Sequence, residues 1–304
     1  MEQTIDSGIS AAAQVLEKFL KSVKNSNGEA CSGKACCKKN PSNLESPENS
    51  GHSGGLGKSR RKRIFLAGDS TVGPFKDPFF IPRNGYGMKM QDMIDAEKAE
   101  VVNFAISGRS SKSFLIEKNY SALIKYIGSG DYLLICFGHN DEKPDKERYS
   151  NAEGAKEDEG SFKYFLYEKY ILPALSAGAE PVLCTPIVRR SPEGIYAGEK
   201  IHITQGAQGF PGGDYPKAIR ELAAQTGVTL IDNTAMTKCL YERIGAEQSA
   251  KFHAQETESF DTLDNTHLNS YGAKIIARMV VEDLARRDSV FANLVLPRNF
   301  TPFN

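Results

Sequence analysis

The sequence lacks tryptophan, an excess of charge of either sign, and any long apolar run. Lys plus Arg and Asp plus Glu number 38 each, so no net field attracts nucleic acid or an anionic membrane, and we expect neither as a partner. No apolar stretch approaches the roughly 20 residues that span a bilayer. The first residues have neither the basic region nor the apolar core of a secretory signal, so we expect a cytoplasmic protein.

Cysteine is also scarce, because six cysteines in 304 residues do not make a disulfide scaffold. Three of them stand in apolar contexts and are expected to pack as small hydrophobic side chains: Cys136, Cys184 and Cys239. The others cluster near the N-terminus: Cys31, Cys36 and Cys37. Their spacing fits no paired metal site, and we favour incidental linker cysteines over reactive or lipid-modified thiols.

Residues 1–62 differ in composition from the rest of the chain and are expected to form a separate region. Residues 9–23 place apolar side chains close to one helical face: Ile9, Ala13, Leu16, Leu20 and Val23. The stretch 25–62 is rich in Ser, Gly, Asn and Lys. Such a stretch buries too little apolar surface to offset its chain entropy. We therefore predict an amphipathic helix followed by a flexible, cysteine-containing linker.

From residue 63 onward, short apolar runs alternate with stretches of helical period, which predicts one α/β domain over 63–304. The expected strands are 64–67, 101–104, 132–137, 181–184 and 228–231. The expected helices are 87–96, 113–127, 161–176, 217–225, 236–244 and 270–286. Continuous apolar strands joined by helices indicate a parallel sheet covered on both faces. The fold class is thus a three-layer α/β/α domain around a five-stranded parallel sheet.

Ligands bind such sheets outside the carboxyl ends of the strands, and one candidate nucleophile follows the first strand there. Ser70 comes after Gly68 and Asp69 at the end of strand 64–67. A simple helix-capping role for Asp69 or Ser70 is the alternative, and Gly-Asp-Ser alone does not decide between them.

Two further segments supply hydrogen-bond donors at the same predicted edge. Gly108 follows the second strand, and Asn140 follows the third through Gly138 and His139. The backbone N–H groups of Ser70 and Gly108, with the Asn140 side-chain amide, would form an oxyanion hole. The structural alternatives are a turn glycine and an Asx-turn residue.

The most specific segment precedes the last long helix. Asp264 and His267 are three residues apart, and on a tight turn the carboxylate reaches the imidazole Nδ1–H. That contact would leave Nε2 facing Ser70. The sequence therefore predicts a catalytic triad of Ser70, His267 and Asp264. His139 is a competing base, but it has no carboxylate at fixed spacing apart from Asp141, and we assign both to support of the site.

The four segments resemble the signature blocks of the SGNH (GDSL) hydrolase superfamily. The longer strings around them resemble its rhamnogalacturonan acetylesterase branch: Leu66-Ala67-Gly68-Asp69-Ser70-Thr71, Asn103-x-Ala105-x-x-Gly108-Arg109-Ser110-Ser111, Phe137-Gly138-His139-Asn140-Asp141 and Asp264-Asn265-Thr266-His267-Leu268. The resemblance spans about residues 63–288. It implies a flavodoxin-like sheet, the triad and oxyanion hole named above, and deacetylation of pectin-type sugars without a metal or cofactor.

The chain departs from this family in two places. The family often has Gly-Gly where this chain has Ser107-Gly108, and often a tryptophan near the position of Tyr86. Without tryptophan, stacking on a sugar would fall to Tyr or Phe.

Candidate substrate contacts come from residues near the predicted edge: Asp69, Arg109, His139, Arg189 and Arg190. Arginine suits the carboxylate of a uronate. The alternative, which we slightly favour for the three arginines, is pairing with acids in the charged loops. Two long loops, 142–159 and 189–213, either shape the site or are mobile surface insertions, and the sequence favours neither.

The predicted function is a serine esterase that removes acetyl groups from acetylated pectin-type (rhamnogalacturonan) saccharides. One alternative is an SGNH esterase that acts on other acetylated glycans or on lipid esters. A second is a module that binds glycans or a protein partner without catalysis. The intact set of Ser70, His267 and Asp264 argues against that second alternative.

Overall fold

The computed structural model describes residues 60–76 and 78–297. The predicted N-terminal helix, most of the linker and the cysteines at 31, 36 and 37 lie outside the described residues. The first strand begins at Lys62, one residue before the predicted start of the domain. In the described part of the chain, no helix combines the length and apolar character needed to cross a membrane.

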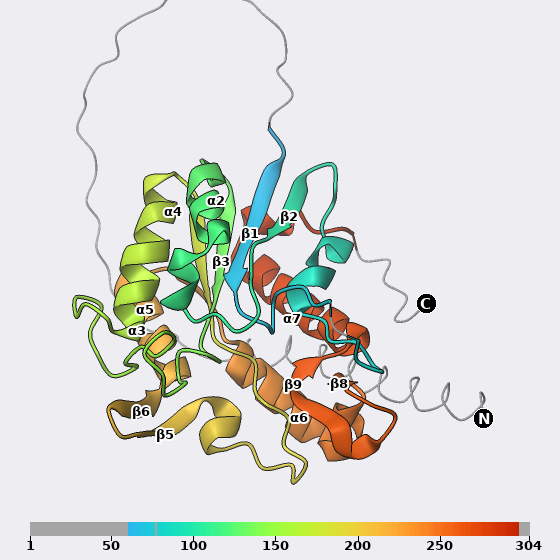
Figure 1. The fold of residues 1–304 in the computed structure, drawn as a ribbon. Coiled ribbons are helices and arrows are strands. Elements are labelled where there is room, and N and C mark those ends of the chain that lie inside the picture. Colours follow the sequence, from blue (N-terminus) through green and yellow to red (C-terminus); the bar gives the residue numbers. More distant parts are fainter. Residues whose placement is uncertain (1–59, 77, 298–304) are drawn as a thin grey trace, which may run out of the picture. The chain divides into compact units, whose positions relative to one another are not determined.

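A five-stranded parallel sheet forms the centre of the domain, as predicted (Figure 1). In spatial order its strands are β2 (Ala99–Asn103), β1 (Lys62–Gly68), β3 (Tyr132–Cys136), β4 (Glu180–Cys184) and β7 (Thr229–Ile231). Ile64 of β1 pairs with Val101 of β2 on one side and Tyr132 of β3 on the other. The chain order reverses at β1, which places the ends of β1, β2 and β3 side by side at one edge.

Both faces of the sheet are covered, because side chains of successive strand residues point to opposite sides. Phe65 and Ala67 of β1 belong to a core shared with the helices between β2 and β7. Ile64 and Leu66 are equally buried and face the other layer. Figure 1 shows the helices α2 to α5 on one side of the sheet and α7 on the other.

The first layer contains α2 (Lys118–Tyr126), α3 (Phe162–Leu166), η3 (Tyr167–Ile171), α4 (Leu172–Ser176) and α5 (Tyr215–Thr226). The second contains η1 (Tyr86–Met93) and α7 (Ser270–Arg287). The remaining elements are η2 (Ser113–Ile116), η4 (Gly198–Ile201), α6 (Asn233–Ala250, kinked at Gly245), η5 (Phe260–Thr262), α8 (Ser289–Ala292) and the strands β5 (Ile203–Ala207), β6 (Phe210–Asp214), β8 (His253–Gln255) and β9 (Leu263–Leu268).

The predicted helix over 161–176 is interrupted by the π-helical segment η3. Pro173 has no N–H group to donate to the carbonyl four residues earlier, that of Lys169. This carbonyl instead accepts a hydrogen bond of 2.9 Å from the Tyr120 hydroxyl. Tertiary contact thus replaces a helical hydrogen bond.

Two other predicted helices differ in form. The stretch 113–127 divides into η2 and α2, because the Glu117 backbone between them is extended. The stretch 87–96 is the 3₁₀-helix η1. Cys136 and Cys184 are buried as predicted, but Cys239 is exposed on α6, so its expected burial is wrong.

The two long loops contact each other beyond the carboxyl ends of the strands. Arg189 of the second loop forms an ion pair with Glu142 of the first. The Tyr149 hydroxyl donates a 2.8 Å hydrogen bond to the carbonyl of Pro211. The second loop also contains η4 and the antiparallel hairpin β5–β6, which the sequence did not predict.

Candidate active site

Ser70 lies on a tight turn directly after β1. A side chain at Gly68 would place its Cβ 2.7 Å from the carbonyl oxygen of Cys136 on β3, so glycine is required there. The N–H groups of Val72 and Gly73 both donate to the Asp69 carbonyl, which closes the turn. Ser70 is thereby held at the sheet edge by backbone contacts.

The structure brings Ser70, His267 and Asp264 together. His267 Nε2 lies 2.9 Å from Ser70 Oγ, and His267 Nδ1 lies 2.7 Å from Asp264 Oδ2. A carboxylate accepts hydrogen bonds, so Nδ1 carries the proton and Nε2 is free to accept the serine hydroxyl proton. This is the arrangement that activates a serine nucleophile.

Asp264 and His267 lie on β9, and this corrects the prediction of a simple turn before α7. The β8–β9 pairing joins His253 to Leu268 and Gln255 to Leu263. These pairs are two residues apart on β8 and five apart on β9, so β9 carries three extra residues. Such a bulge re-aims side chains, and here it directs both triad residues toward the end of β1.

The Asp264 carboxylate forms hydrogen bonds with the backbone of this bulge. Its Oδ1 accepts hydrogen bonds from the N–H groups of Thr266 and His267, at 2.9 and 3.0 Å. Burial alone would raise the pKa of Asp264. The hydrogen bond and charge of His267, with the two N–H donors, outweigh burial and lower that pKa to about 2. The carboxylate is therefore ionised at neutral pH.

The predicted oxyanion donors lie at the ends of β2 and β3. Gly108 has a φ of 76°, a backbone conformation that side chains disfavour, and its surroundings are open. Asn140 Nδ2 donates to the carbonyl of Arg109 at 3.1 Å, and its Oδ1 accepts from Arg148 Nη1 at 3.4 Å. These contacts fix the orientation of the amide and leave its second N–H group available.

Asp69 and His139 are buried, and this corrects their prediction as substrate contacts. Asp69 Oδ1 accepts hydrogen bonds from the N–H and hydroxyl groups of Thr71, and burial raises the pKa of the carboxyl. His139 packs its ring against His202, with centroids 4.3 Å apart. Burial lowers the pKa of His139 well below its usual range. His139 is therefore neutral.

Asp141 links the loops that follow β2 and β3. It accepts hydrogen bonds from the Ser111 N–H and hydroxyl groups and from the Ser150 hydroxyl. Burial raises the pKa of Asp141 to about 7, against the lowering effect of these donors. Its contacts suit the supporting role assigned from the sequence.

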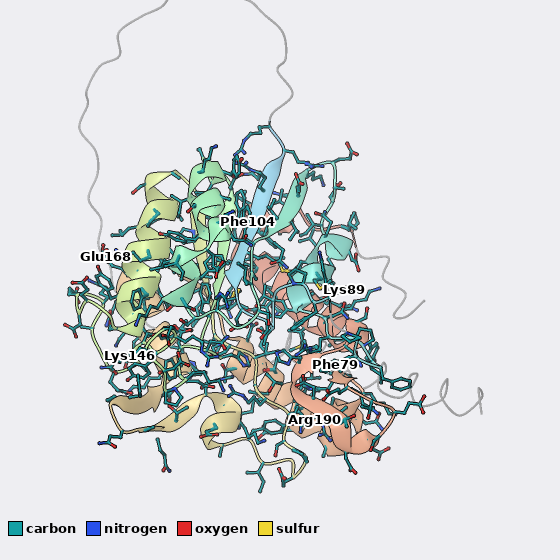
Figure 2. All side chains as sticks on the ribbon, viewed as in Figure 1. Phe79, Lys89, Phe104, Lys146, Glu168 and Arg190 are labelled. Atoms are coloured by element: carbon teal, nitrogen blue, oxygen red, sulfur yellow. The ribbon has the colours of Figure 1, made fainter. Side chains whose placement is uncertain are left out.

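All three candidate arginines bind other protein groups, but only Arg189 pairs with an acid of the charged loops, as the favoured alternative expected. Arg109 forms an ion pair with Glu117, and Arg189 with Glu142. Arg190 is buried and donates to the Asn265 side chain and the Ala246 carbonyl, each at 2.8 Å. Figure 2 shows it at the end of the molecule where β8 and β9 lie. For Arg190 we replace the predicted substrate contact with support of the segment that carries Asp264.

Aromatic side chains flank the histidine of this site. The Phe75 ring contacts His267 edge-on, with centroids 5.3 Å apart. The Arg83 guanidinium lies over both Phe75 and Phe79, at 4.6 and 4.2 Å from the ring centroids. Tyr86, which occupies the position where tryptophan is frequent in the resembling family, is buried and does not offer a stacking surface. No sequence motif pointed to Phe75.

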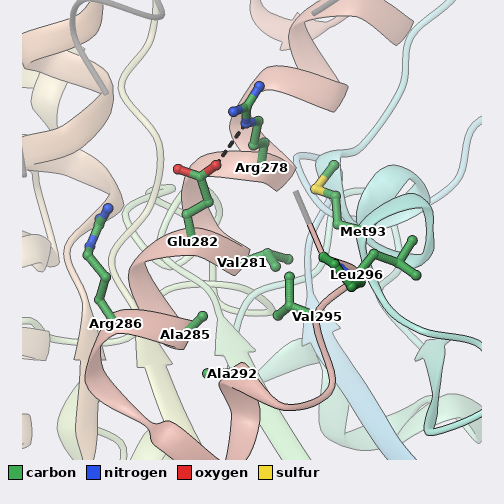
Figure 3. A pocket seen from close by; sticks show the side chains of 10 residues that line it. Met93, Arg278, Val281, Glu282, Ala285, Arg286, Ala292, Val295 and Leu296 are labelled. Atoms are coloured by element: carbon green, nitrogen blue, oxygen red, sulfur yellow. Dashed lines mark hydrogen bonds and ion pairs between the residues drawn. The ribbon is translucent and has the colours of Figure 1, made fainter. Parts of the chain in front are cut away.

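An open cavity of about 610 Å³ adjoins the proposed oxyanion donor Gly108. Its lining is mostly charged: Gly108, Arg109, Ser113, Ile116, Glu117, Asp145, Glu147 and Arg148. A second cavity of about 340 Å³ lies between α7, Met93 and the segment that ends at Pro297, and contains no candidate site residue (Figure 3). Within the described residues, no group of three His, Cys, Asp or Glu side chains is placed to hold a metal ion.

Comparison with known proteins gives a consistent set of similarities. Residues 64–280 match the GDSL-like lipase/acylhydrolase family. Rhamnogalacturonan acetylesterase RhgT of Bacillus subtilis is 34% identical over 73% of this chain and 89% of its own length. The probable rhamnogalacturonan acetylesterase YesY of the same organism is 32% identical over 73% of this chain and 91% of its own. The crystal structure of B. subtilis YxiM superposes with a TM-score of 0.59 at 26% identity, covering 75% of this chain and 57% of that one.

Proposed function

Because the chain belongs to the GDSL-like lipase/acylhydrolase family, we propose that it removes acetyl groups from acetylated rhamnogalacturonan through a triad of Ser70, His267 and Asp264. The chain is an ester hydrolase, and its relatives make it a carbohydrate acetylesterase of the SGNH family. The observation that carries the mechanism is the His267 imidazole, which bridges Ser70 Oγ and Asp264 Oδ2.

The reaction proceeds in two steps around one imidazole. Ser70 Oγ forms a bond to the acetyl carbonyl carbon while its proton passes to His267 Nε2. The ester C–O bond then breaks, and the same proton goes to the departing sugar hydroxyl. In the second step His267 takes a proton from water, which attacks the acetyl-serine, and acetate leaves as Ser70 regains its proton.

When Ser70 attacks, the acetyl carbonyl oxygen becomes negatively charged and must be stabilised by hydrogen-bond donors. We assign this role to the N–H groups of Ser70 and Gly108 and to Asn140 Nδ2, which already donates one N–H to the Arg109 carbonyl. Preorganised donors act strongly because no reorganisation is needed during the reaction, and one of them is worth roughly 3 kcal/mol of the barrier.

The saccharide is proposed to occupy the cavity beside Gly108. The acetyl carbonyl oxygen must approach the Gly108 N–H group, so the groups bonded to that carbonyl lie nearby. One of them is a methyl group, and a cavity of about 610 Å³ is much larger than a methyl group needs. The cavity therefore suits the sugar side of the ester. Charged side chains that line the cavity, such as Arg148 and Glu147, can form hydrogen bonds with sugar hydroxyl groups but not with acyl chains.

This lining also bears on the alternative of a lipid esterase. A site for a long acyl chain requires an apolar surface. Ile116 is the only large aliphatic side chain that lines the described cavity at Gly108. This lining favours a carbohydrate ester.

An acetate-release screen tests the proposal. Wild-type protein is incubated with acetylated rhamnogalacturonan, acetylated xylan and p-nitrophenyl acetate, beside Ser70→Ala and the exposed control Ser176→Ala. We expect release by the wild type and by Ser176→Ala, highest on rhamnogalacturonan, and none by Ser70→Ala. Unchanged turnover in Ser70→Ala would refute the mechanism. Equal rates on unrelated acetyl esters would refute only the rhamnogalacturonan assignment.

A further inference from the structure

The bulge in β9 removes the regular backbone pairing of Asp264 and His267 with β8. Its three extra residues take the backbone of Asp264 and His267 out of register with β8, so these residues lack the ladder partners of a regular strand pair. A carbonyl group left unpaired in a buried place is costly and leaves its segment poorly fixed. The Asp264 carboxylate satisfies N–H groups of the bulge but cannot satisfy carbonyls.

The buried imidazole of His253 forms hydrogen bonds with the backbone carbonyl groups of both Asp264 and His267. His253 Nδ1 lies 2.8 Å from the Asp264 carbonyl oxygen and 3.1 Å from that of His267. Carbonyl oxygens only accept, so Nδ1 carries the proton and donates to both. His253 thus joins the backbones of the two triad residues through a single N–H group.

The opposite nitrogen of this ring is held as well. Tyr241 on α6 places its hydroxyl 2.8 Å from His253 Nε2, and both side chains are fully buried. Since Nδ1 holds the ring proton, Nε2 accepts the hydrogen bond from Tyr241. Burial lowers the pKa of His253 to about 4, so the ring is neutral under ordinary conditions and its second nitrogen stays an acceptor.

The backbone of His253 is fixed from the side of α7. Asn269 Nδ2 donates to the His253 carbonyl at 3.0 Å, while Asn269 Oδ1 accepts the N–H of Gly272 in the first turn of α7. His253 is therefore attached to α6 through its ring and to the start of α7 through its backbone. Movement of the ring would move the two catalytic backbones with it.

We propose that His253 is a positioning residue, oriented by Tyr241, which sets the spacing of Asp264 and His267 and thereby their alignment with Ser70. The proposal rests on the proposed triad but not on which sugar is the substrate. Neither residue touches the reacting atoms. Both act on the rate through His267, because a misplacement of about 1 Å in a catalytic group reduces the rate about 100-fold.

Two variants and one control test this role on p-nitrophenyl acetate. His253→Phe keeps a ring but removes the donor to both carbonyls, and Tyr241→Phe removes only the hydroxyl that orients the ring. Tyr196→Phe is the control, because Tyr196 is a buried tyrosine that packs on Tyr241 but bonds to Ser191 instead of the bulge. We expect kcat to fall about 10- to 100-fold in His253→Phe and by less in Tyr241→Phe, with KM unchanged.

A spectroscopic readout separates positioning from a general loss of stability. The proton shared by His267 Nδ1 and Asp264 should give a downfield resonance in the proton NMR spectrum, assigned by its loss in His267→Gln. We expect it to shift or broaden in Tyr241→Phe and to stay unchanged in Tyr196→Phe at equal folded fraction. The double variant His253→Phe/Tyr241→Phe should be no slower than His253→Phe alone, because Tyr241 acts through His253.

Several results would overturn the inference. One is that Tyr241→Phe keeps the full kcat in the case where His253→Phe does not fold. A second is that Tyr196→Phe loses as much kcat as the two test variants. A third is that kcat falls in Tyr241→Phe while the resonance of the His267 Nδ1 proton does not move. Failure of the proposed function looks different. If Ser70→Ala still hydrolyses p-nitrophenyl acetate, the triad itself is wrong. If the wild type hydrolyses that ester but not acetylated rhamnogalacturonan, only the substrate assignment fails.

Discussion

Replacement of Asp264 by asparagine separates the electrostatic role of this side chain from its shape. The variant keeps one oxygen, which the N–H groups of Thr266 and His267 already require at 2.9 and 3.0 Å. The new amide nitrogen then faces His267 Nδ1 and donates to it. That contact moves the ring proton to Nε2, where it blocks transfer from Ser70.

The expected loss of activity is large. The wrong histidine tautomer in a serine–histidine–aspartate triad lowers kcat by about 10⁴-fold, and we expect a fall of this order in Asp264→Asn. Binding is unaffected, so KM for p-nitrophenyl acetate should change little. Steady-state kinetics on this ester measure both parameters without dependence on the sugar.

The same substitution has a calculable effect on stability. The carboxyl of Asp264 has its pKa lowered from 3.8 to about 2, and each unit is worth about 1.4 kcal/mol. A lowered folded-state pKa stabilises the protein above the unfolded value and ceases to do so as pH falls through the folded value. The ionised side chain, about a fifth exposed, thus contributes about 2.5 kcal/mol at pH 7, most of which is lost as the pH falls from about 4 to about 2.

Urea unfolding of wild type and Asp264→Asn at pH 7 and at successively lower pH measures this contribution. The difference between the two should be largest above pH 4 and should shrink as the pH falls below it. A variant that retains a tenth or more of the wild-type kcat would refute the assigned role of Asp264. A stability difference that grows on acidification would refute the assigned charge state.

Other substitutions test separate parts of the site. Asn140→Ala should lower kcat about 100- to 1,000-fold on any acetyl ester with little change in KM, and an unaltered kcat would remove Asn140 from the oxyanion hole. Gly68→Ala should destabilise the fold, because its Cβ would lie 2.7 Å from the Cys136 carbonyl; an unchanged urea midpoint would contradict this packing. Glu147→Gln in the cavity should alter KM for the saccharide but not for p-nitrophenyl acetate, and equal effects on both esters would place the sugar elsewhere.

Much of the fold follows from local patterns in the sequence. Short apolar runs predicted a strand at all five positions of the parallel sheet. The reason is clearest for β1, β3 and β4, which are mostly buried, because a strand buried on both faces reads as a continuous apolar run. The contact between Asp264 and His267 could be predicted because a three-residue spacing already restricts how the two side chains meet. The placement of Ser70 and Asn140 at the edge of the sheet could be predicted because each lies shortly after a buried strand.

The elements that were missed depend on contacts distant in the sequence. His253 stands in a short polar stretch, and nothing near it indicates that its ring meets the carbonyls of residues 264 and 267. The bulge of β9 exists only through its pairing with β8. Likewise, Arg190 resembled a substrate contact because its partner, Asn265, lies 75 residues further along the chain. Local periodicity carries no information about such pairs.

The central claim is that Ser70 is the nucleophile, and active-site labelling tests it most directly. The protein is treated with a fluorophosphonate, and residual acetate release is followed while peptide mass spectrometry locates the modification. We predict one phosphonate group per chain, on Ser70, in proportion to lost activity, and no labelling of Ser70→Ala. Modification of a different residue with the same loss of activity, or full activity after Ser70 is labelled, would contradict the account.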